Sequence, residues 1–535
     1  MQYRRVSLAG ASALALVSCG GGGGNGGGNP PPTGGPTPPP TLNVTLSEAS
    51  ADVVLDEGGE ATFGFDASYT GTSSQAIIAD VEIGGRRYQL DGDVTGSGST
   101  FTVNLKTVPF PAGGATTSTV RFRLCTTAAC STVYPGSTQT FTVNLDVEVG
   151  DWAGFQRNAA HTGYVPVRLA PADFALAWEW TDTDLTSWIR PPAASRGRII
   201  TTVGRDGGMP YFQNAKVYAF NTDGSNAWSF DLGEQSNMSG PSLSNGMVHV
   251  TSMEFSSRDN PQWVFDAANG SFVNQMKFAS QWHDFNQPAA MGDQVFVAAG
   301  YTGGVLFSYD AVQGTKLWEV PVADSSWADG KAVAVDGDTV LYPASSALVV
   351  IDRATGQEQG RIIDPDVEAR FVSSFESAPV IGNDGMVFLF SGEKRFNSSA
   401  KIMGVSLTEN RIVWKSVAEY TTAFAVAGDT IYAVRNDAHV LAALDAKTGQ
   451  QKWATQLPVD TGLYGERIFQ GNVVVTENLV FVSDHDTTWA VDLKDDAHPI
   501  VWEAPTGGRL IITPDNQLVT TGVREFRKLT VYDLF

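Results

Sequence analysis

Residues 442–453 read AALDAKTGQQKW, and this stretch decides the fold of the chain. Its apolar start predicts a β-strand that ends at Asp445, and the following residues predict a tight turn that closes at Gly449. The residues after the turn predict a second strand, which carries Trp453. The stretch is therefore a hairpin with one large aromatic side chain on its second strand.

Related stretches recur on both sides of this hairpin. Each has an apolar run that ends in a residue equivalent to Asp445, which we call the anchor. The anchors are Asn221, Asp266, Asp310, Asp352, Leu407, Asp445, Asp492 and Asp533. They lie roughly 38 to 55 residues apart, a period that fits a unit of about four strands. Repeats of this length, all predicted as β-structure, indicate a β-propeller with one blade per repeat.

A second periodic feature supports the same count. Before each anchor, an apolar run, a tight turn and another apolar run predict one more hairpin. These turns lie near Gly197, Gly246, Gly292, Gly337, Gly385, Gly428, Asn478 and Asn516. Two hairpins per repeat make four strands, so the sequence predicts an all-β fold with an eight-bladed propeller.

The two ends of the repeat region complement each other. The last repeat has no fourth strand after Asp533, whereas residues 174–180, FALAWEW, form a Trp-containing run before the first hairpin. Pairing these two segments would complete the eighth blade and remove two open sheet edges. We therefore expect a propeller over residues 174–535, closed by pairing of 174–180 with the C-terminal blade.

Six tryptophans share one repeat position, on the fourth strand. We expect them to pack between neighbouring blades and to donate a hydrogen bond from the indole N–H. The second and fourth blades have Asn274 and Gly360 at this position. The tryptophans are Trp178, Trp228, Trp318, Trp414, Trp453 and Trp502.

The N-terminus predicts export and a tether. A basic start and a short apolar run, the shape of a signal peptide, end at the sequence LVSCG. This sequence resembles a bacterial lipobox, which implies that Cys19 is lipidated. The absence of Asp after Cys19 implies an outer-membrane lipoprotein on the periplasmic or cell-surface side. We expect residues 1–19 to be signal peptide and lipobox, and the Gly/Pro-rich residues 20–40 to be a disordered tether.

Residues 41–150 alternate apolar and polar residues between turn signals, which predicts an immunoglobulin-like β-sandwich. Cys125 and Cys130 lie in this region, just after a predicted strand. In an exported protein they are expected to form a local disulfide. A metal or redox role for the pair is the alternative, although no His or third thiol lies nearby in the sequence.

The bulk composition limits the classes of partner and cofactor that are expected. The chain has 535 residues and a formal net charge of −22, without a stripe of Lys or Arg, so phosphate backbones would repel it and nucleic acid is not an expected partner. The three cysteines form no CxxC pair, which gives no support to haem attachment or a cysteine zinc site. Outside the N-terminus, no apolar run is long enough to predict a membrane span.

Residues 151–173 are expected to be a lead-in segment. They include Trp152 and the sequence His161-Thr162-Gly163. This lead-in, followed by the repeats up to Phe535, resembles bacterial proteins with pyrroloquinoline-quinone-like (PQQ-like) repeats over about two thirds of the chain. His161 has no partner at metal-ligand spacing, so a structural role is expected for it.

The connections from second to third strands, and from fourth strands to the next blade, are longer than the tight turns. Their aromatic and charged residues either form a binding rim around the central channel or plug the channel and cap the blades. The candidate rim residues are Trp188, Arg190, Trp282, His283, Asp284, Trp327, Asp329, Phe375, Glu376, Tyr420, Tyr464, Arg467 and Arg509.

Two functions follow from resemblance. PQQ-dependent dehydrogenases of alcohols or sugars use adjacent, disulfide-bonded cysteines, a stacking Trp, calcium and an Asp base. This chain has no adjacent cysteines, although Trp282 or Trp327 would suit stacking, and Asp284, Asp329 or Glu376 would suit calcium. PQQ and calcium therefore belong to the alternative hypothesis, and neither a catalytic residue nor a resident cofactor or metal is expected.

The chain is also similar to BamB-type propeller lipoproteins of the outer-membrane assembly machinery, from which the predicted sandwich and long tether depart. This similarity implies a non-enzymatic, envelope-anchored scaffold. Its propeller face would engage a protein partner, possible roles being outer-membrane protein assembly or a surface complex, and the lipid anchor would hold it on the membrane. A glycan is the next candidate ligand, because an aromatic rim suits sugar stacking.

Overall fold

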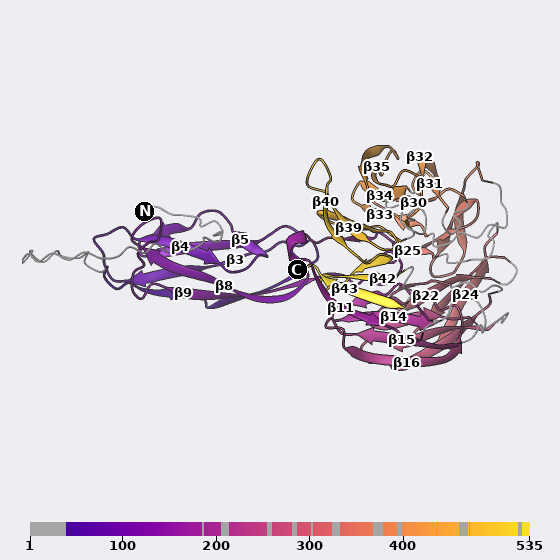
Figure 1. Cartoon of the computed structure of the whole chain (residues 1–535), viewed down its shortest axis with the longest axis horizontal. Coiled ribbons are helices and arrows are strands. Elements are labelled where there is room, and N and C mark those ends of the chain that lie inside the picture. The colour runs from indigo at the N-terminus through magenta and orange to yellow at the C-terminus, as the bar shows by residue number, and fades with distance from the viewer. Residues whose placement is uncertain are drawn as a thin grey trace, which may run out of the picture. The chain divides into compact units, whose positions relative to one another are not determined.

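The fold is described from a computed structural model of the chain (Figure 1). It describes residues 39–184, 187–204, 213–253, 259–280, 286–300, 303–323, 332–367, 378–392, 398–435, 437–458, 469, 471–522 and 527–535. Strands dominate these ranges, and their one helix is a short 3₁₀ turn at Pro171–Asp173. No described helix has the length and apolar character needed to cross a membrane. Cys19 and almost all of the predicted tether lie outside the described residues.

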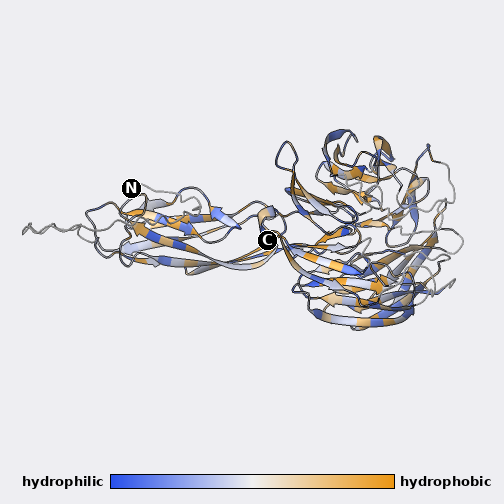
Figure 2. Ribbon diagram, in the orientation of Figure 1, coloured by the Kyte–Doolittle hydropathy of each residue, from blue (hydrophilic) through white to orange (hydrophobic). Residues whose placement is uncertain are grey.

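The chain divides into two compact units. The N-terminal unit comprises Met1–Pro111 and Ala115–Glu148, and the repeat unit comprises Ala112–Gly114 and Val149–Phe535. In both units, apolar and polar residues are interspersed along the strands (Figure 2). The alternation of apolar and polar residues that predicts strands is therefore the pattern that builds both cores.

The N-terminal unit contains two sheets. One has the order β1 (Asn43–Leu46), β3 (Thr62–Thr70), β7 (Thr100–Thr107) and β5 (Tyr88–Leu90), with β6 (Thr95–Ser97) also paired to β7. The other has the order β2 (Ser50–Asp56), β9 (Gln139–Glu148), β8 (Gly114–Cys125) and β4 (Ile78–Ile83). Phe65 of the first sheet contacts Phe122 and Phe141 of the second, so the two sheets pack face to face.

The described residues of the repeat unit form eight sheets, numbered 1 to 8 along the chain, each built on four antiparallel strands that are consecutive in the chain except in sheet 8. Sheet 1 has β12 (Trp188–Ile189) and β13 (Ala193–Ser195), which share the first position, β14 (Arg198–Gly204), β15 (Gln213–Phe220) and β16 (Asn226–Gln235); sheet 2 has β17 (Ser242–Ser244), β18 (Met247–Thr251), β19 (Asn260–Asp266) and β20 (Phe272–Phe278). Sheet 3 has β21 (Pro288–Met291), β22 (Gln294–Ala299), β23 (Val305–Asp310) and β24 (Thr315–Pro321); sheet 4 has β25 (Ala334–Asp336), β26 (Thr339–Pro343), β27 (Ala347–Asp352) and β28 (Glu358–Ile363).

The second half of the repeat unit continues the pattern. Sheet 5 has β29 (Val380–Ile381), β30 (Met386–Phe390), β31 (Ala400–Ser406) and β32 (Arg411–Tyr420); sheet 6 has β33 (Ala425–Ala427), β34 (Thr430–Arg435), β35 (Val440–Asp445) and β36 (Gln451–Gln456). Sheet 7 has β37 (Val474–Thr476), β38 (Leu479–Ser483), β39 (Thr488–Asp492) and β40 (Ile500–Ala504), with β10 (Tyr164–Val165) added in parallel to β37. Sheet 8 has β41 (Arg509–Ile512), β42 (Gln517–Thr521), β43 (Lys528–Asp533) and β11 (Ala175–Thr181).

Sheet 8 contains both ends of the repeat region. β11 pairs antiparallel with β43, and Trp178 lies opposite Val531. The early Trp-containing run thus supplies the fourth strand of the last sheet. Neither strand is left as an open edge toward the other, which removes a site of unwanted strand pairing.

Successive sheets pack against one another through apolar side chains. One cluster joins sheets 1 and 2 through Val217 and Val250, and another joins sheets 5 and 6 through Phe388 and Ile431. Similar clusters join each consecutive pair from sheet 2 to sheet 5, and sheets 6 and 7. The second and third strands of each sheet are therefore buried between neighbours, as β18 and β38 show, whereas fourth strands such as β36 alternate with exposed positions.

A contact that recurs along the repeat unit joins the fourth strand of one sheet to a turn of the next sheet. The indole N–H of Trp228 donates a hydrogen bond of 3.0 Å to the carbonyl of Ala267, in the turn between the third and fourth strands of sheet 2. The same turn contains Gly270, whose φ is +72° and where a Cβ atom would overlap the Trp228 ring. Trp178, Trp318 and Trp414 make the same bond to Thr222, Arg353 and Ala446.

The remaining junctions achieve the contact differently. Asn274 of sheet 2 donates two hydrogen bonds, of 2.8 and 2.7 Å, to the carbonyls of Ala311 and Val312 in sheet 3. Trp453 stacks on the His498 ring, with centroids 4.0 Å apart. Trp502 meets Phe174 edge to face, with a centroid distance of 5.3 Å. Side chains of different chemistry therefore fill one geometric position.

Candidate functional site

The first part of the lead-in occupies the axis of the repeat unit. We call residues 152–163 the central segment. Six of its carbonyl groups accept a hydrogen bond, each from an N–H on the first strand of a different sheet. The acceptors and donors are Trp152 and Ala194, Ala153 and Leu243, Ala159 and Val335, Ala160 and Ile381, Thr162 and Val426, and Gly163 and Val475, at 2.6–2.9 Å. The first strands of sheets 1, 2, 4, 5, 6 and 7 thus surround this segment.

Each donor lies close to the tight turn between the first and second strands of its sheet. The central segment therefore fills the axis at one end of the repeat unit, which we call the turn end. The opposite end, the loop end, carries the connections from second to third strands and from fourth strands to the next sheet. A ligand approaching the axis from the turn end would have to break the backbone hydrogen bonds of the central segment.

Side chains reinforce the central segment. Gln156 donates to the carbonyl of Phe424 at 2.8 Å and accepts from the side chain of Asn472 at 2.8 Å. The ring of His161 is 2% exposed, contacts Phe155, and its Nδ1 lies 3.0 Å from the carbonyl oxygen of Pro379. Burial lowers the pKa of His161 to about 4, so the imidazole is neutral at pH 7. The residue packs the segment, which agrees with the structural role expected for it.

At the loop end, two arginines come together across the junction of sheets 8 and 1. Arg190 lies between β12 and β13, and its backbone N–H donates to the carbonyl of Thr202 at 2.9 Å. Arg509 is the first residue of β41. Burial, together with the positive charge of Arg190, lowers the pKa of Arg509 to about 10. The two guanidinium groups are therefore close enough to interact at this junction.

This arginine pair is fixed by its surroundings. The guanidinium of Arg190 lies 6.0 Å from the ring centroid of Trp188, at cation–π distance. The side chain of Asn472 accepts from the backbone N–H of Leu510 and donates to its carbonyl, both at 2.9 Å. Because Asn472 also bonds to Gln156, the central segment is connected to the strand that begins with Arg509.

The other predicted rim residues have different outcomes. Tyr420 is 1% exposed and belongs to the core cluster of sheets 5 and 6, so it lies in the core and not on an exposed rim. The end of β32, where Tyr420 pairs with Ala400, turns into the core instead of toward solvent. Arg190, at 7% exposure, is also buried and not on an open rim. The predicted rim residues outside the described ranges are Trp282, His283, Asp284, Trp327, Asp329, Phe375, Glu376, Tyr464 and Arg467.

A buried ion pair marks the junction of sheets 4 and 5. Lys415 on β32 bonds to the carboxylate of Asp364 and, at 2.7 Å, to that of Asp366. Burial alone would raise the pKa of Asp364, but the hydrogen bonds from Lys415 and Ser391 outweigh it and lower the pKa. The pair lies beside a shallow recess that Asp364 itself helps to line. Since the equivalent tryptophan position is Gly360 here, this ion pair joins the two sheets where no indole does.

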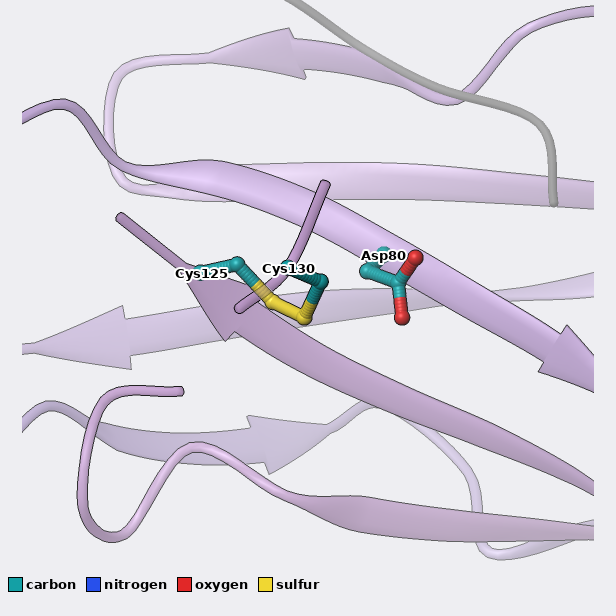
Figure 3. A group of neighbouring side chains, drawn as sticks. All are labelled: Asp80, Cys125 and Cys130. Carbon is teal, nitrogen blue, oxygen red and sulfur yellow. A yellow bond between two sulfur atoms is a disulfide. The ribbon is translucent and has the colours of Figure 1, made fainter. Parts of the chain in front are cut away.

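The described residues contain one group of three side chains with metal-ligand chemistry. It consists of Asp80, Cys125 and Cys130 in the N-terminal unit (Figure 3), and the two cysteines are disulfide-bonded. Nothing in the sequence spacing signals Asp80, because it reaches the cysteines only through the pairing of β4 with β8. The acidic residues predicted for a calcium site in the repeat unit lie outside the described ranges.

The repeated four-stranded sheets define the class of the fold as a β-propeller built from PQQ-like repeats. The family described as outer membrane protein assembly factor BamB matches residues 213–455. No curated protein is a significant match to the chain. The crystal structure of BamB from Moraxella catarrhalis is similar, with 17% identity, a TM-score of 0.50, and coverage of 67% of this chain and 99% of that chain. A europium-containing methanol dehydrogenase has 12% identity, a TM-score of 0.54, and coverage of 72% and 98%. At these identities the likeness is one of fold.

Proposed function

We propose that the protein is a non-enzymatic scaffold of the bacterial cell envelope, whose loop end binds a protein partner. The observation that carries this proposal is the central segment, which fills the axis at the turn end with six backbone hydrogen bonds. Partner access is therefore assigned to the loop end. The match of residues 213–455 to the BamB family supports a scaffold of envelope assembly or of a surface complex.

The proposal includes a specific architecture. Each of the eight sheets is one blade of an eight-bladed propeller, consistent with the core clusters that join consecutive sheets. The N-terminal unit is an immunoglobulin-like module, because its two sheets have the strand order of that fold. Lipidation at Cys19 would anchor the chain in the outer membrane, with residues 20–40 as a spacer.

The junction of sheets 8 and 1 is the proposed place of contact at the loop end. Arg190 and Arg509 meet there, and their side chains are buried among the surrounding segments. Replacing both would alter the packing of this junction, and with it the surface that the loop end offers to a partner.

Pull-down from detergent-solubilised envelope, combined with crosslinking, tests the proposal. The double variant Arg190→Gln, Arg509→Gln is expected to lose at least about tenfold in recovered partner, since a change of about 1.4 kcal/mol at the altered junction is a tenfold change in affinity. Arg411→Gln is the control, because Arg411 is exposed and begins β32, next to a tight turn at the turn end of its sheet. Circular dichroism and thermal melting verify that the variants fold. Equal recovery by folded double variant and control would contradict the choice of the loop end.

The fold likeness to a methanol dehydrogenase makes a PQQ- and calcium-dependent oxidation of alcohols or sugars the second candidate. The sequence offers Asp284, Asp329 or Glu376 for calcium, but it lacks the adjacent cysteines that these dehydrogenases use. We expect purified protein mixed with PQQ and calcium to show no dye-coupled oxidation of either substrate class. Turnover that disappears on chelation would overturn the scaffold proposal.

A further inference from the structure

Asp80, Cys125 and Cys130 are brought together by the register of two strands. β4 pairs antiparallel with β8, so that Ile78 lies opposite Cys125 and Asp80 opposite Arg123. Asp80 and Cys125 are therefore diagonal neighbours on one face of the sheet. The short loop after β8 returns Cys130 to the same place, and the carboxyl group of Asp80 lies beside the two sulfur atoms (Figure 3).

The carboxylate is buried with one of its oxygens unused. Asp80 is 2% exposed, and its Oδ2 accepts a hydrogen bond of 2.6 Å from Nε of Arg123. Its Oδ1 is buried and accepts no hydrogen bond from the described residues. A buried carboxylate oxygen without a donor is costly, and such a group in a native fold calls for an explanation.

The neighbouring sulfurs supply that explanation. One ligand atom from each of the three residues lies within 4.8 Å of the other two. Zinc binds thiolate sulfur and carboxylate oxygen in a tetrahedral arrangement, and three protein ligands leave the fourth position to water. We propose that, when the Cys125–Cys130 disulfide is reduced, Asp80, Cys125 and Cys130 bind one zinc-class divalent cation.

The disulfide-bonded state is converted to the metal-binding dithiol state by thiol–disulfide exchange. A dithiol reductant gives two electrons and two protons to the bond between Cys125 and Cys130, which breaks into two thiols, and the dithiol becomes a disulfide. Cys130 is partly exposed whereas Cys125 is fully buried, so attack on the Cys130 sulfur releases Cys125 as the leaving thiolate. Binding of the cation then displaces the thiol protons into solvent and forms two metal–sulfur bonds and one metal–oxygen bond.

Cobalt(II) absorption measures this site in the full chain. The parent variant is Cys19→Ser, which leaves Cys125 and Cys130 as the two cysteines of the chain. After reduction with a phosphine and its removal, titration with Co²⁺ is expected to give a sulfur-to-metal charge-transfer band at one equivalent, which Zn²⁺ abolishes. The oxidised protein is expected to give no such band.

Two substitutions on β4 distinguish the loss of a metal ligand from the loss of a nearby negative charge. Asp80→Asn is expected to weaken Co²⁺ binding by the reduced protein at least about tenfold. Glu82→Gln is the matched control, because Glu82 lies two residues further along β4 and is paired with Arg121. Its affinity is expected to stay within about twofold of the parent. Equal affinities of Asp80→Asn and the parent, or an equal band in the oxidised protein, would refute the proposal.

A second readout needs no substitution at Asp80 and applies if that variant does not fold. Zinc is expected to slow the alkylation of Cys125 and Cys130 in the reduced parent at least tenfold, whereas magnesium, which prefers oxygen ligands, leaves the rate unchanged. Equal alkylation rates with and without zinc would show that the two thiols bind no zinc and would overturn the proposal.

Discussion

The periphery and the axis of the repeat unit hold the same sheets together by different means. At the periphery, a side chain from the fourth strand of one sheet, such as Trp228, contacts a turn of the next sheet. At the axis, carbonyl groups of the central segment accept hydrogen bonds from six first strands. Peripheral contacts depend on a side chain at a repeated position, whereas axial contacts depend on the path of the backbone. Mutations at the two places should therefore have different consequences.

The largest effect is expected at a peripheral indole. Trp228→Ala removes a buried ring and its hydrogen bond to Ala267, and should lower the free energy of unfolding by about 3–5 kcal/mol. Guanidinium chloride denaturation followed by tryptophan fluorescence and circular dichroism measures the loss. Trp228→Phe keeps most of the apolar area and should lose about 1–2 kcal/mol. A loss below 1 kcal/mol for Trp228→Ala would mean that the periphery does not hold the sheets.

Gly270→Ala tests whether the turn that contacts the Trp228 indole requires glycine. The new methyl group must adopt a positive φ and overlaps the Trp228 ring, which should cost about 3 kcal/mol. Gly428→Ala is the control, because Gly428 also has a positive φ of 56° but open space around the Cβ position. The control should lose only about 1 kcal/mol, from backbone strain. Equal losses would show that strain, and not the close approach of the indole, sets the requirement for glycine.

The axis should respond to acid through His161. Burial lowers the pKa of His161 to about 4, whereas an unfolded histidine titrates near 6.5. Between these values the unfolded state binds more protons, so acidification destabilises the fold, by about 2 kcal/mol from pH 7.5 to 5 for this residue. Buried His249, with a pKa also lowered to about 4, adds a similar loss.

His161→Asn removes the His161 contribution, and Asn tolerates the positive φ of 59° at this position. Denaturation midpoints at pH 7.5 and 5 should therefore differ less in this variant than in the wild type. An unchanged pH dependence would mean that His161 is already charged in the folded protein, and that the axial segment is open to water.

The smallest loss of stability is expected at Asn274, where a side-chain amide takes the place of the tryptophan. Asn274→Ala removes two hydrogen bonds at a half-buried position and should cost about 1 kcal/mol. Asn274→Asp, which replaces the donor group with an oxygen facing two carbonyls, should cost more than the alanine variant. Thermal melting ranks the two variants. A more stable Asp variant would show that the hydrogen bonds to Ala311 and Val312 do not stabilise this junction.

Sequence reasoning succeeds where the structure repeats itself. The tight turns and anchors mark the hairpins, because a turn with positive φ or Asp capping leaves a local signature at a constant period. The tryptophan position is equally visible, although Asn274 shows that the period preserves a geometry and not a residue type. The four-strand unit and its recurrence could therefore be predicted.

The site could be predicted only in part, for physical reasons. The central segment acts through backbone carbonyls, which every residue has, so its sequence carries no sign of the six strands it joins. The burial of Tyr420 could not be predicted, because loop length does not reveal which way a strand end turns. Arg190 and Arg509 meet only because sheet 8 lies beside sheet 1, and Asp80 meets the cysteines only through strand register.

The pairing of β11 with β43 has a consequence for folding while the chain is being synthesised. β11 is made early, yet its partner is one of the last segments of the repeat unit to be synthesised, and closing so long a loop is slow. Until then, β11 presents an unpaired edge that could join a strand of another chain. Between the synthesis of β11 and its pairing with β43, the chain is therefore most exposed to aggregation. This risk ends when β43 has been synthesised and has paired with β11.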